Sequence, residues 1–218
     1  MKIISFILVF IFCNDLLSQA LSKGSFSANL DYDVAIYGVV YTSKYKDNLI
    51  QQDTTASGTQ MFRINANYSI FKWFSAGIDF RTGSYIEDPE NAEANGNGVN
   101  IWGLNFRLYP INRNKFTWYL GTSFGGSNLE INRKYTLLIS WNEKYKFNAP
   151  HFGMETGFNW YFTKNFGFNF GLGYCSQNYT MKEKYINSDR QNLTDWNNQL
   201  TATGINLNLG LSYHIGGN

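Results

Sequence analysis

The sequence is short of charge and of proline, and each shortage excludes a class of protein. Charged residues make up 16% of the 218 residues, against about 25% in an ordinary soluble domain. With only 3 prolines and an aromatic content of 18%, the composition is not that of a disordered chain. The formal net charge of +2 gives no support for a nucleic-acid partner. The mean hydropathy of −0.31 excludes a conventional multi-helix membrane protein.

Cysteine is nearly absent as well. Only Cys13 and Cys175 occur. Cys13 follows Phe12, where lipoprotein processing prefers a small side chain, and it falls within the expected leader described next. A mature chain with Cys175 as its single thiol can form no internal disulfide and no cysteine-based zinc site. We expect no metal and no cofactor.

The first 20 residues have the pattern of a secretory signal peptide. Lys2 gives the positive start, an apolar run of about ten residues follows, and Ser18 and Ala20 are the small residues of a cleavage site. The apolar run is shorter than the roughly 20 residues of a membrane-spanning helix. We therefore expect residues 1–20 to be a cleaved signal peptide and residues 21–218 to form a single domain.

Strict alternation of apolar and polar residues dominates the rest of the chain. In the first alternating segment Phe26, Leu30 and Ile36 share one face, and Asp31 and Asp33 lie on the other. Period-2 alternation predicts β-strands with one apolar face. Eight segments show it: residues 26–36, 62–70, 74–81, 102–108, 116–124, 152–162, 166–174 and 205–215. An even number of antiparallel strands returns both ends of the chain to the same side of the sheet.

The connections between these segments are alternately short and long. Short turns are predicted near residues 71–73, 111–115 and 163–165, and long loops at about residues 42–57, 83–100, 126–149 and 176–201. Long structureless loops are uncommon in compact soluble domains. Short turns at one end and long loops at the other are typical of outer-membrane barrels.

Alternation alone leaves open whether the apolar face points inward or outward, because a soluble lipocalin-like barrel has the same period. Three features favour lipid outside: the apolar faces are too aromatic to fit inside eight strands, the opposite faces are small and polar, and aromatic residues gather at both strand ends. Near the short turns these aromatic residues are Trp73, Phe74, Tyr109, Phe116, Trp118, Trp160, Phe162 and Phe166; near the long loops they are Tyr41, Trp102, Phe124, Phe152 and Tyr174. We therefore predict an all-β fold, an eight-stranded antiparallel up-and-down transmembrane β-barrel with short periplasmic turns and long extracellular loops.

Three stretches carry a resemblance to a known family: GFNWYFTKNFGFNFGLGY (157–174), YPINRNKFTWYLGTSF (109–124) and GINLNLGLSYHI (204–215). They resemble the OmpA/OmpX-type small barrels, and most of all the outer-membrane barrel-domain proteins of Bacteroidetes. The resemblance implies an eight-stranded barrel in the outer membrane of a Gram-negative bacterium, and it implies no particular activity. The final strand ends in Ile215 rather than in the usual aromatic residue, but we still expect the barrel-assembly machinery to recognise it.

Seven charged residues are expected to face the lumen by strand parity, where isolated charges are costly and pairs are expected. They are Asp31, Asp33, Arg63, Asp79, Arg81, Arg107 and Glu155. One interpretation is an ion or proton path or a gate. The other, which we favour, is a salt-bridge network that seals the barrel, because eight strands leave no open channel.

The function expected from these features is that of a non-enzymatic, porin-like barrel with a charge-plugged lumen. Its loops would serve envelope integrity or interaction with a surface ligand, and its partners would be outer-membrane lipid and lipopolysaccharide. One alternative is a transport or secretion accessory for small or hydrophobic molecules. A third hypothesis is a lipid A-modifying enzyme centred on His151 at the outer rim, with Ser140, Glu143 or Ser176 nearby, although an interfacial histidine among aromatic residues is the simpler interpretation.

Overall fold

The structure, a computed structural model, describes residues 20–46, 48–88, 92–94, 96–136 and 140–216. The expected leader up to residue 19, with Cys13 and most of the cleavage site, lies outside the described residues. The strands are β1 (Phe26–Tyr45), β2 (Asn48–Phe71), β3 (Phe74–Ile86), β4 (Glu93–Ala94), β5 (Gly98–Arg113), β6 (Phe116–Tyr135), β7 (Trp141–Tyr161), β8 (Phe166–Ile186), β9 (Asp189–Arg190) and β10 (Trp196–Ile215).

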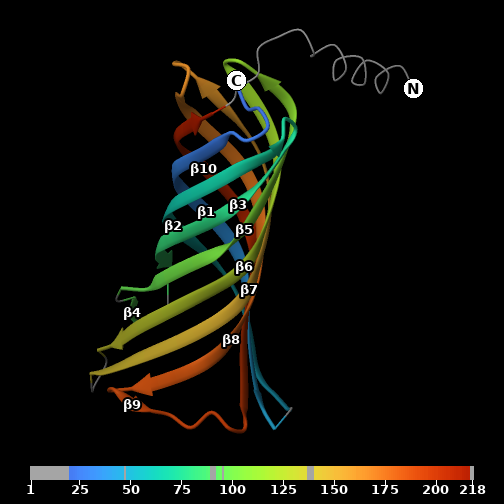
Figure 1. Ribbon diagram of the computed structural model, residues 1–218. Coiled ribbons are helices and arrows are strands. Elements are labelled where there is room, and N and C mark those ends of the chain that lie inside the picture. The colour runs from blue at the N-terminus through green and yellow to red at the C-terminus, as the bar shows by residue number, and fades with distance from the viewer. Residues whose placement is uncertain (1–19, 47, 89–91, 95, 137–139, 217–218) are drawn as a thin grey trace.

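The eight long strands form one closed antiparallel ring in the order β10-β1-β2-β3-β5-β6-β7-β8, and β8 pairs with β10 to close it. Figure 1 shows the strands winding obliquely around the barrel, with the short turns at the top and the long hairpins at the bottom. Closure pairs the backbone groups between strands, which is what a sheet in lipid needs. The described residues contain no helix long and apolar enough to span a membrane. The predicted fold class is confirmed.

The strands are much longer than the sequence pattern indicated. The segments expected as long loops are mostly β-structure, because β1 and β2 are joined within a few residues of Tyr45, and β6 and β7 continue to Tyr135 and Trp141. The prediction that residues 42–57 and 126–149 are loops is therefore wrong. We call the part of the barrel that ends at Tyr45, Tyr135 and Trp141, beyond the apolar exterior described next, the hairpin extension. It is the lower part of Figure 1.

Large apolar side chains cover the exterior of the half with short turns. Along β1 the exposed and buried residues alternate, so Leu30 is 55% and Ile36 is 65% exposed while Asp31 is 1% exposed. A protein has an apolar exterior of this extent only where lipid, rather than water, surrounds it. We call it the apolar belt; its members include Leu30, Ile36, Phe62, Ile64, Ile78, Leu104, Met154, Trp160, Phe168, Ile205, Leu209 and Leu211.

Aromatic side chains border the apolar belt. Trp73 and Trp160 are exposed near the short turns, and Trp102 and Phe124 are exposed toward the hairpin extension. Two residues predicted for this border lie elsewhere. Tyr41 is partly buried and packs against the apolar cluster inside the barrel. Tyr109 is buried inside the barrel, because Leu108 before it points outward and successive side chains of a strand point to opposite faces.

Beyond the belt the alternation changes sides without a change of strand. On β6 the outward residues change from Phe124 to Asn128 and Asn132, and the inward residues change from Ser123 to Leu129 and Ile131. Strand β6 thus has apolar groups on its outer face where lipid is expected and on its inner face where water is expected outside. The predicted polar lumen holds only for the half with short turns.

The described chain begins inside the short-turn end. Leu21 is buried against Tyr109 and Tyr119. Its backbone N–H donates to Asn112 Oδ1 at 3.0 Å, and Asn112 Nδ2 donates to its carbonyl at 2.6 Å. These contacts hold the segment before β1 across the end of the lumen.

Candidate functional site

The seven charged residues predicted to face the lumen lie together near the middle of the belt. Asp31 and Asp33 come from β1, Arg63 from β2, Asp79 and Arg81 from β3, Arg107 from β5 and Glu155 from β7. Their side chains are between 0% and 7% exposed wherever they form ion pairs. We call this set the charge layer.

Arg63 is at the centre of the charge layer. Its Nε donates to Asp79 Oδ1 at 2.7 Å and its Nη1 donates to Glu155 Oε2 at 2.6 Å. Glu155 also accepts from Arg107 at 3.0 Å, and its strand β7 is not a neighbour of β2 or β5 in the ring. The Arg63–Glu155 pair therefore crosses the lumen, because β2 and β7 lie on opposite sides of the ring. The Arg107–Glu155 pair bridges the intervening strand β6 at Gly121.

A second set of contacts extends the layer around the ring. Arg81 contacts Asp79 at 2.8 Å and Asp33 at 3.5 Å. Asn206 of β10 donates to Asp33 at 2.8 Å, and Asn169 of β8 donates to Asp31 at 2.9 Å. The Arg107 guanidinium lies 4.1 Å from the centre of the ring of Tyr119, which belongs to β6. Every long strand thus contributes at least one side chain to a continuous network.

The layer holds three guanidinium groups and four carboxyl groups, so the acidic side chains outnumber the basic ones by one. Among the described residues, one carboxylate oxygen of Asp31 and one of Asp33 have no hydrogen-bond partner. Gly121 makes room for the long side chains, because a Cβ there would lie 2.9 Å from Glu155 Cγ. A buried network of this kind is costly to break, because removing one partner leaves another charge uncompensated.

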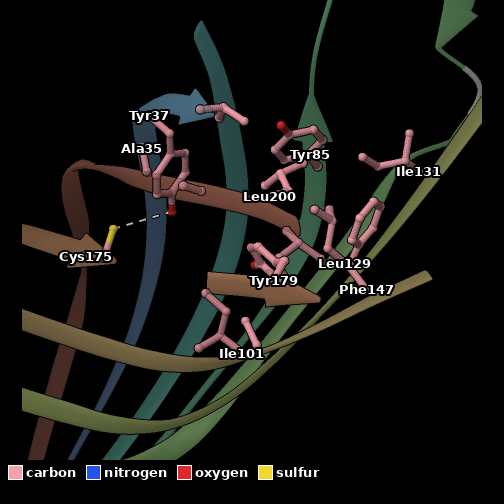
Figure 2. Close-up of a cluster of buried hydrophobic side chains, with 14 of the residues drawn as sticks. Ala35, Tyr37, Tyr85, Ile101, Leu129, Ile131, Phe147, Cys175, Tyr179 and Leu200 are labelled. Carbon is pink, nitrogen blue, oxygen red and sulfur yellow. Dashed lines mark hydrogen bonds between the residues drawn. The ribbon is translucent and has the colours of Figure 1, made fainter. Parts of the chain in front are cut away.

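The interior of the hairpin extension is apolar. Figure 2 shows its side chains pointing toward one another from several strands, with the Cys175 thiol 3.5 Å from the Tyr37 hydroxyl. We call this cluster the apolar core; its members are Ala35, Tyr37, Val39, Met61, Tyr85, Val99, Ile101, Leu129, Ile131, Phe147, Ala149, Cys175, Tyr179, Met181, Leu200 and Ala202. An extension with its own core does not depend on lipid for burial.

His151 lies between the charge layer and the apolar core. It is 4% exposed and faces the interior, so the expectation of an interfacial histidine among aromatic residues is wrong. Its Nε2 is 3.1 Å from Ser123 Oγ and its Nδ1 is 3.0 Å from Gln177 Nε2. The third member is an amide rather than the carboxylate that orients a catalytic histidine. In the described part of the chain, no three His, Cys, Asp or Glu residues are placed to hold a metal ion.

The similarity of this chain to known proteins is one of structure. No family model matches the chain, and no curated protein sequence matches it. The outer membrane protein OprG from Pseudomonas aeruginosa is similar in structure, with 13% identity, coverage of 92% of this chain and 100% of that chain, and a TM-score of 0.61. The outer membrane protein AlkL, solved in DMPC lipid bilayers, has 14% identity, coverage of 91% and 93%, and a TM-score of 0.54.

This chain has the fold of a small outer-membrane β-barrel. The apolar belt supplies the exterior that such a barrel needs, so the short turns are its periplasmic end and the hairpin extension is its extracellular end. The identities are low, and the comparisons therefore establish the fold and no activity.

Ion pairs continue onto the extracellular part of this outer-membrane barrel. Arg133 contacts Glu87 at 2.8 Å, and that hydrogen bond raises the pKa of Arg133. Lys146 contacts Glu183 at 2.8 Å; the hydrogen bond lowers the pKa of Glu183 and raises that of Lys146. These pairs are partly exposed, so each contributes little to stability.

The apolar core was not predicted from the sequence. Its signal was present, because Leu129 and Ile131 alternate with Asn128 and Glu130, as Tyr179 and Met181 do with polar neighbours. The polar outward residues made these segments look like loops. Following the alternation past the change of sides would have found both the longer strands and the core.

Proposed function

We propose that this chain is a non-conducting, non-enzymatic barrel of the outer membrane, whose extracellular extension serves surface interaction or envelope integrity. The observation that supports this most directly is the charge layer, in which the ion pair from Arg63 to Glu155 crosses the lumen and Arg107 adds a second ion pair to Glu155. Next to this layer, Ser123, Glu155 and Cys175 line a cavity of about 10 Å³, room for a single water molecule. A lumen filled in this way would block ions rather than conduct them.

The extension supports the surface role. It is a continuous β-structure with its own apolar core and a largely polar exterior, so it can hold a fixed shape beyond the membrane. Outward basic residues such as Lys144 and Lys146 lie on it, and phosphate groups of lipopolysaccharide are partners of suitable charge. Lipid around the belt and the barrel-assembly machinery during insertion complete the proposed partners. The buried Ser123–His151–Gln177 chain favours a structural role over a lipid A-modifying one.

Electrical recording tests the plug. In planar lipid bilayers the purified barrel is expected to show no steady conductance above that of the protein-free membrane, because the ion pairs fill the lumen at the level of Arg63. A known porin reconstituted in the same way supplies the positive control. Stable, ohmic pores from correctly folded protein, checked by heat-modifiable gel mobility, would contradict the proposal.

A second candidate function, passage of small hydrophobic molecules, is favoured by one observation: the interior of the extension is lined by apolar side chains. This candidate predicts that cells expressing the barrel take up a hydrophobic fluorescent probe faster than cells with an empty vector. Ala202→Phe, which fills the interior, is expected to slow uptake, and Thr201→Phe on the outward face of the same strand is not. Equal uptake by all strains removes this candidate.

A further inference from the structure

Strand β2 continues beyond the point where its neighbour β3 ends. The pairing of β2 with β3 stops at Gly58 and Ile86, whereas the pairing of β2 with β1 continues to Asn48. Within the described residues, Asn48–Ser57 is therefore paired on one side only. In Figure 1 the hairpin of β1 and β2 projects at the lower right, in blue and teal. The ring is closed in the belt and has a free strand edge in the extension.

The backbone groups along this edge can be assigned from the alternation of β2. Nearer the short turns, the carbonyl oxygens of Gln60 and Ala66 face β3, where each lies close to a glycine of that strand. Since alternate residues direct their N–H and C=O groups to the same side, Gln52, Thr54 and Ala56 direct theirs to the free edge. The residues between them face β1 and are paired with it.

The edge lacks two of the protections that natural proteins give to such strands. Asn48–Ser57 contains no proline and no lysine, and every residue from Asn48 to Ala56 is exposed. Leu49 and Ile50 at its end are 56% and 58% exposed. Short strands, lysine and proline are the usual means of keeping an edge from pairing. A long, unprotected edge outside the membrane is suited to pairing.

We propose that this edge binds an extended polypeptide segment, which adds a strand antiparallel to β2 and carries a basic residue opposite Asp53. Main-chain hydrogen bonds to Gln52, Thr54 and Ala56 would supply the affinity of such strand addition. Asp53 is the one charged residue of Asn48–Ser57, so it determines the sign of the charge that the partner carries there. The ligand class is an extended, β-forming peptide with a lysine or arginine near its centre.

A second copy of the chain fits this edge less well. Two barrels inserted in the same membrane have the same orientation relative to the membrane normal, so their β2 strands run in the same direction across it. A two-fold axis along the normal therefore cannot bring the two edges antiparallel unless the strands lie flat on the membrane, and barrel strands are tilted by about 40°. A separate peptide has no such constraint.

The inference rests on the surface-interaction part of the proposed function, and hydrogen exchange tests it independently of conductance. The probe is a ten-residue peptide of alternating threonine and valine with one central lysine, added to the barrel in nanodiscs. Amide exchange at Gln52, Thr54 and Ala56 is expected to slow by at least about tenfold, while Gln51, Asp53 and Thr55, already paired with β1, stay unchanged.

Matched variants separate strand addition from a general effect. Thr54→Pro removes one edge N–H without removing a bond to β1 and is expected to weaken peptide binding about tenfold, whereas Thr54→Ala keeps the N–H and binds normally. Replacing the peptide's lysine by glutamate is expected to weaken binding as well. No protection with the peptide overturns the inference, even if the barrel is non-conducting. Protection that appears without peptide and grows with protein concentration also overturns it, in favour of a second copy.

Discussion

Replacing Arg63 by methionine is expected to lower the free energy of unfolding by about 3–5 kcal/mol, among the largest effects of any single substitution in this barrel. Arg63 is fully buried and is the shared partner of Asp79 and Glu155. Without its guanidinium, two carboxylates remain buried with fewer compensating charges. Urea unfolding in lipid vesicles, followed by tryptophan fluorescence and by gel mobility, measures the change.

Two further variants decide whether the network itself is responsible. Arg63→Lys keeps the charge but loses the planar fork that reaches both acids, so an intermediate loss is expected. Lys144→Met removes a cation from the exposed pair with Glu130, whose side chains are 40% and 38% exposed, and is expected to cost about 1 kcal/mol or less. Equal losses from Arg63→Met and Lys144→Met would show that the charge layer does not stabilise the fold.

Arginine at Ile64 is expected to destabilise the barrel by about 2–4 kcal/mol, the cost of a charge on the lipid face near the bilayer midplane. Ile64 is 54% exposed and pairs with Leu30, in the middle of the apolar belt. The same unfolding measurement in vesicles reports the loss.

Asn128→Arg is the matched control. Asn128 also points outward, but it lies beyond the belt, where the outward residues of β6 are polar. A change within about 0.5 kcal/mol is expected there. If arginine at Ile64 were tolerated as well as arginine at Asn128, the exterior of this half would be in contact with water, and a transmembrane barrel would be the wrong description.

The sequence predicted the part of the fold where a single rule applies. Within the belt every strand has apolar residues outside and polar residues inside, so segments such as 26–36 and 205–215 were found with the correct faces. The strand parity of Arg63, Asp79 and Glu155 was readable for the same reason. Their mutual distances were not, because contacts across the lumen depend on the register of strands far apart in the chain.

The rest of the fold was not predicted because the surroundings of the strands change from lipid to water along their length. Asn128, Glu130 and Asn132 face outward there, so the polarity expected for loops belongs to strands. The inward face of His151 follows from its parity with Glu155 on β7, but its contact with Ser123 was missed because it depends on the pairing of β6 with β7. The alternation predicts the face of the strand on which a residue lies. Whether lipid, water or other side chains surround that face depends on the assembled ring.

The contact of Leu21 with Tyr109 and Tyr119 adds a small apolar cluster to the lumen on the periplasmic side of the charge layer. In the proposed plugged lumen, water entering from the periplasm would meet the leucine and the two tyrosine rings before it reaches the arginines of the charge layer. If the lumen is plugged as proposed, loosening the apolar cluster leaves the charge layer in place, and the reverse also holds. We therefore expect leakage and resistance to unfolding to be separable, so that a substitution can weaken the barrel severely without opening it to ions.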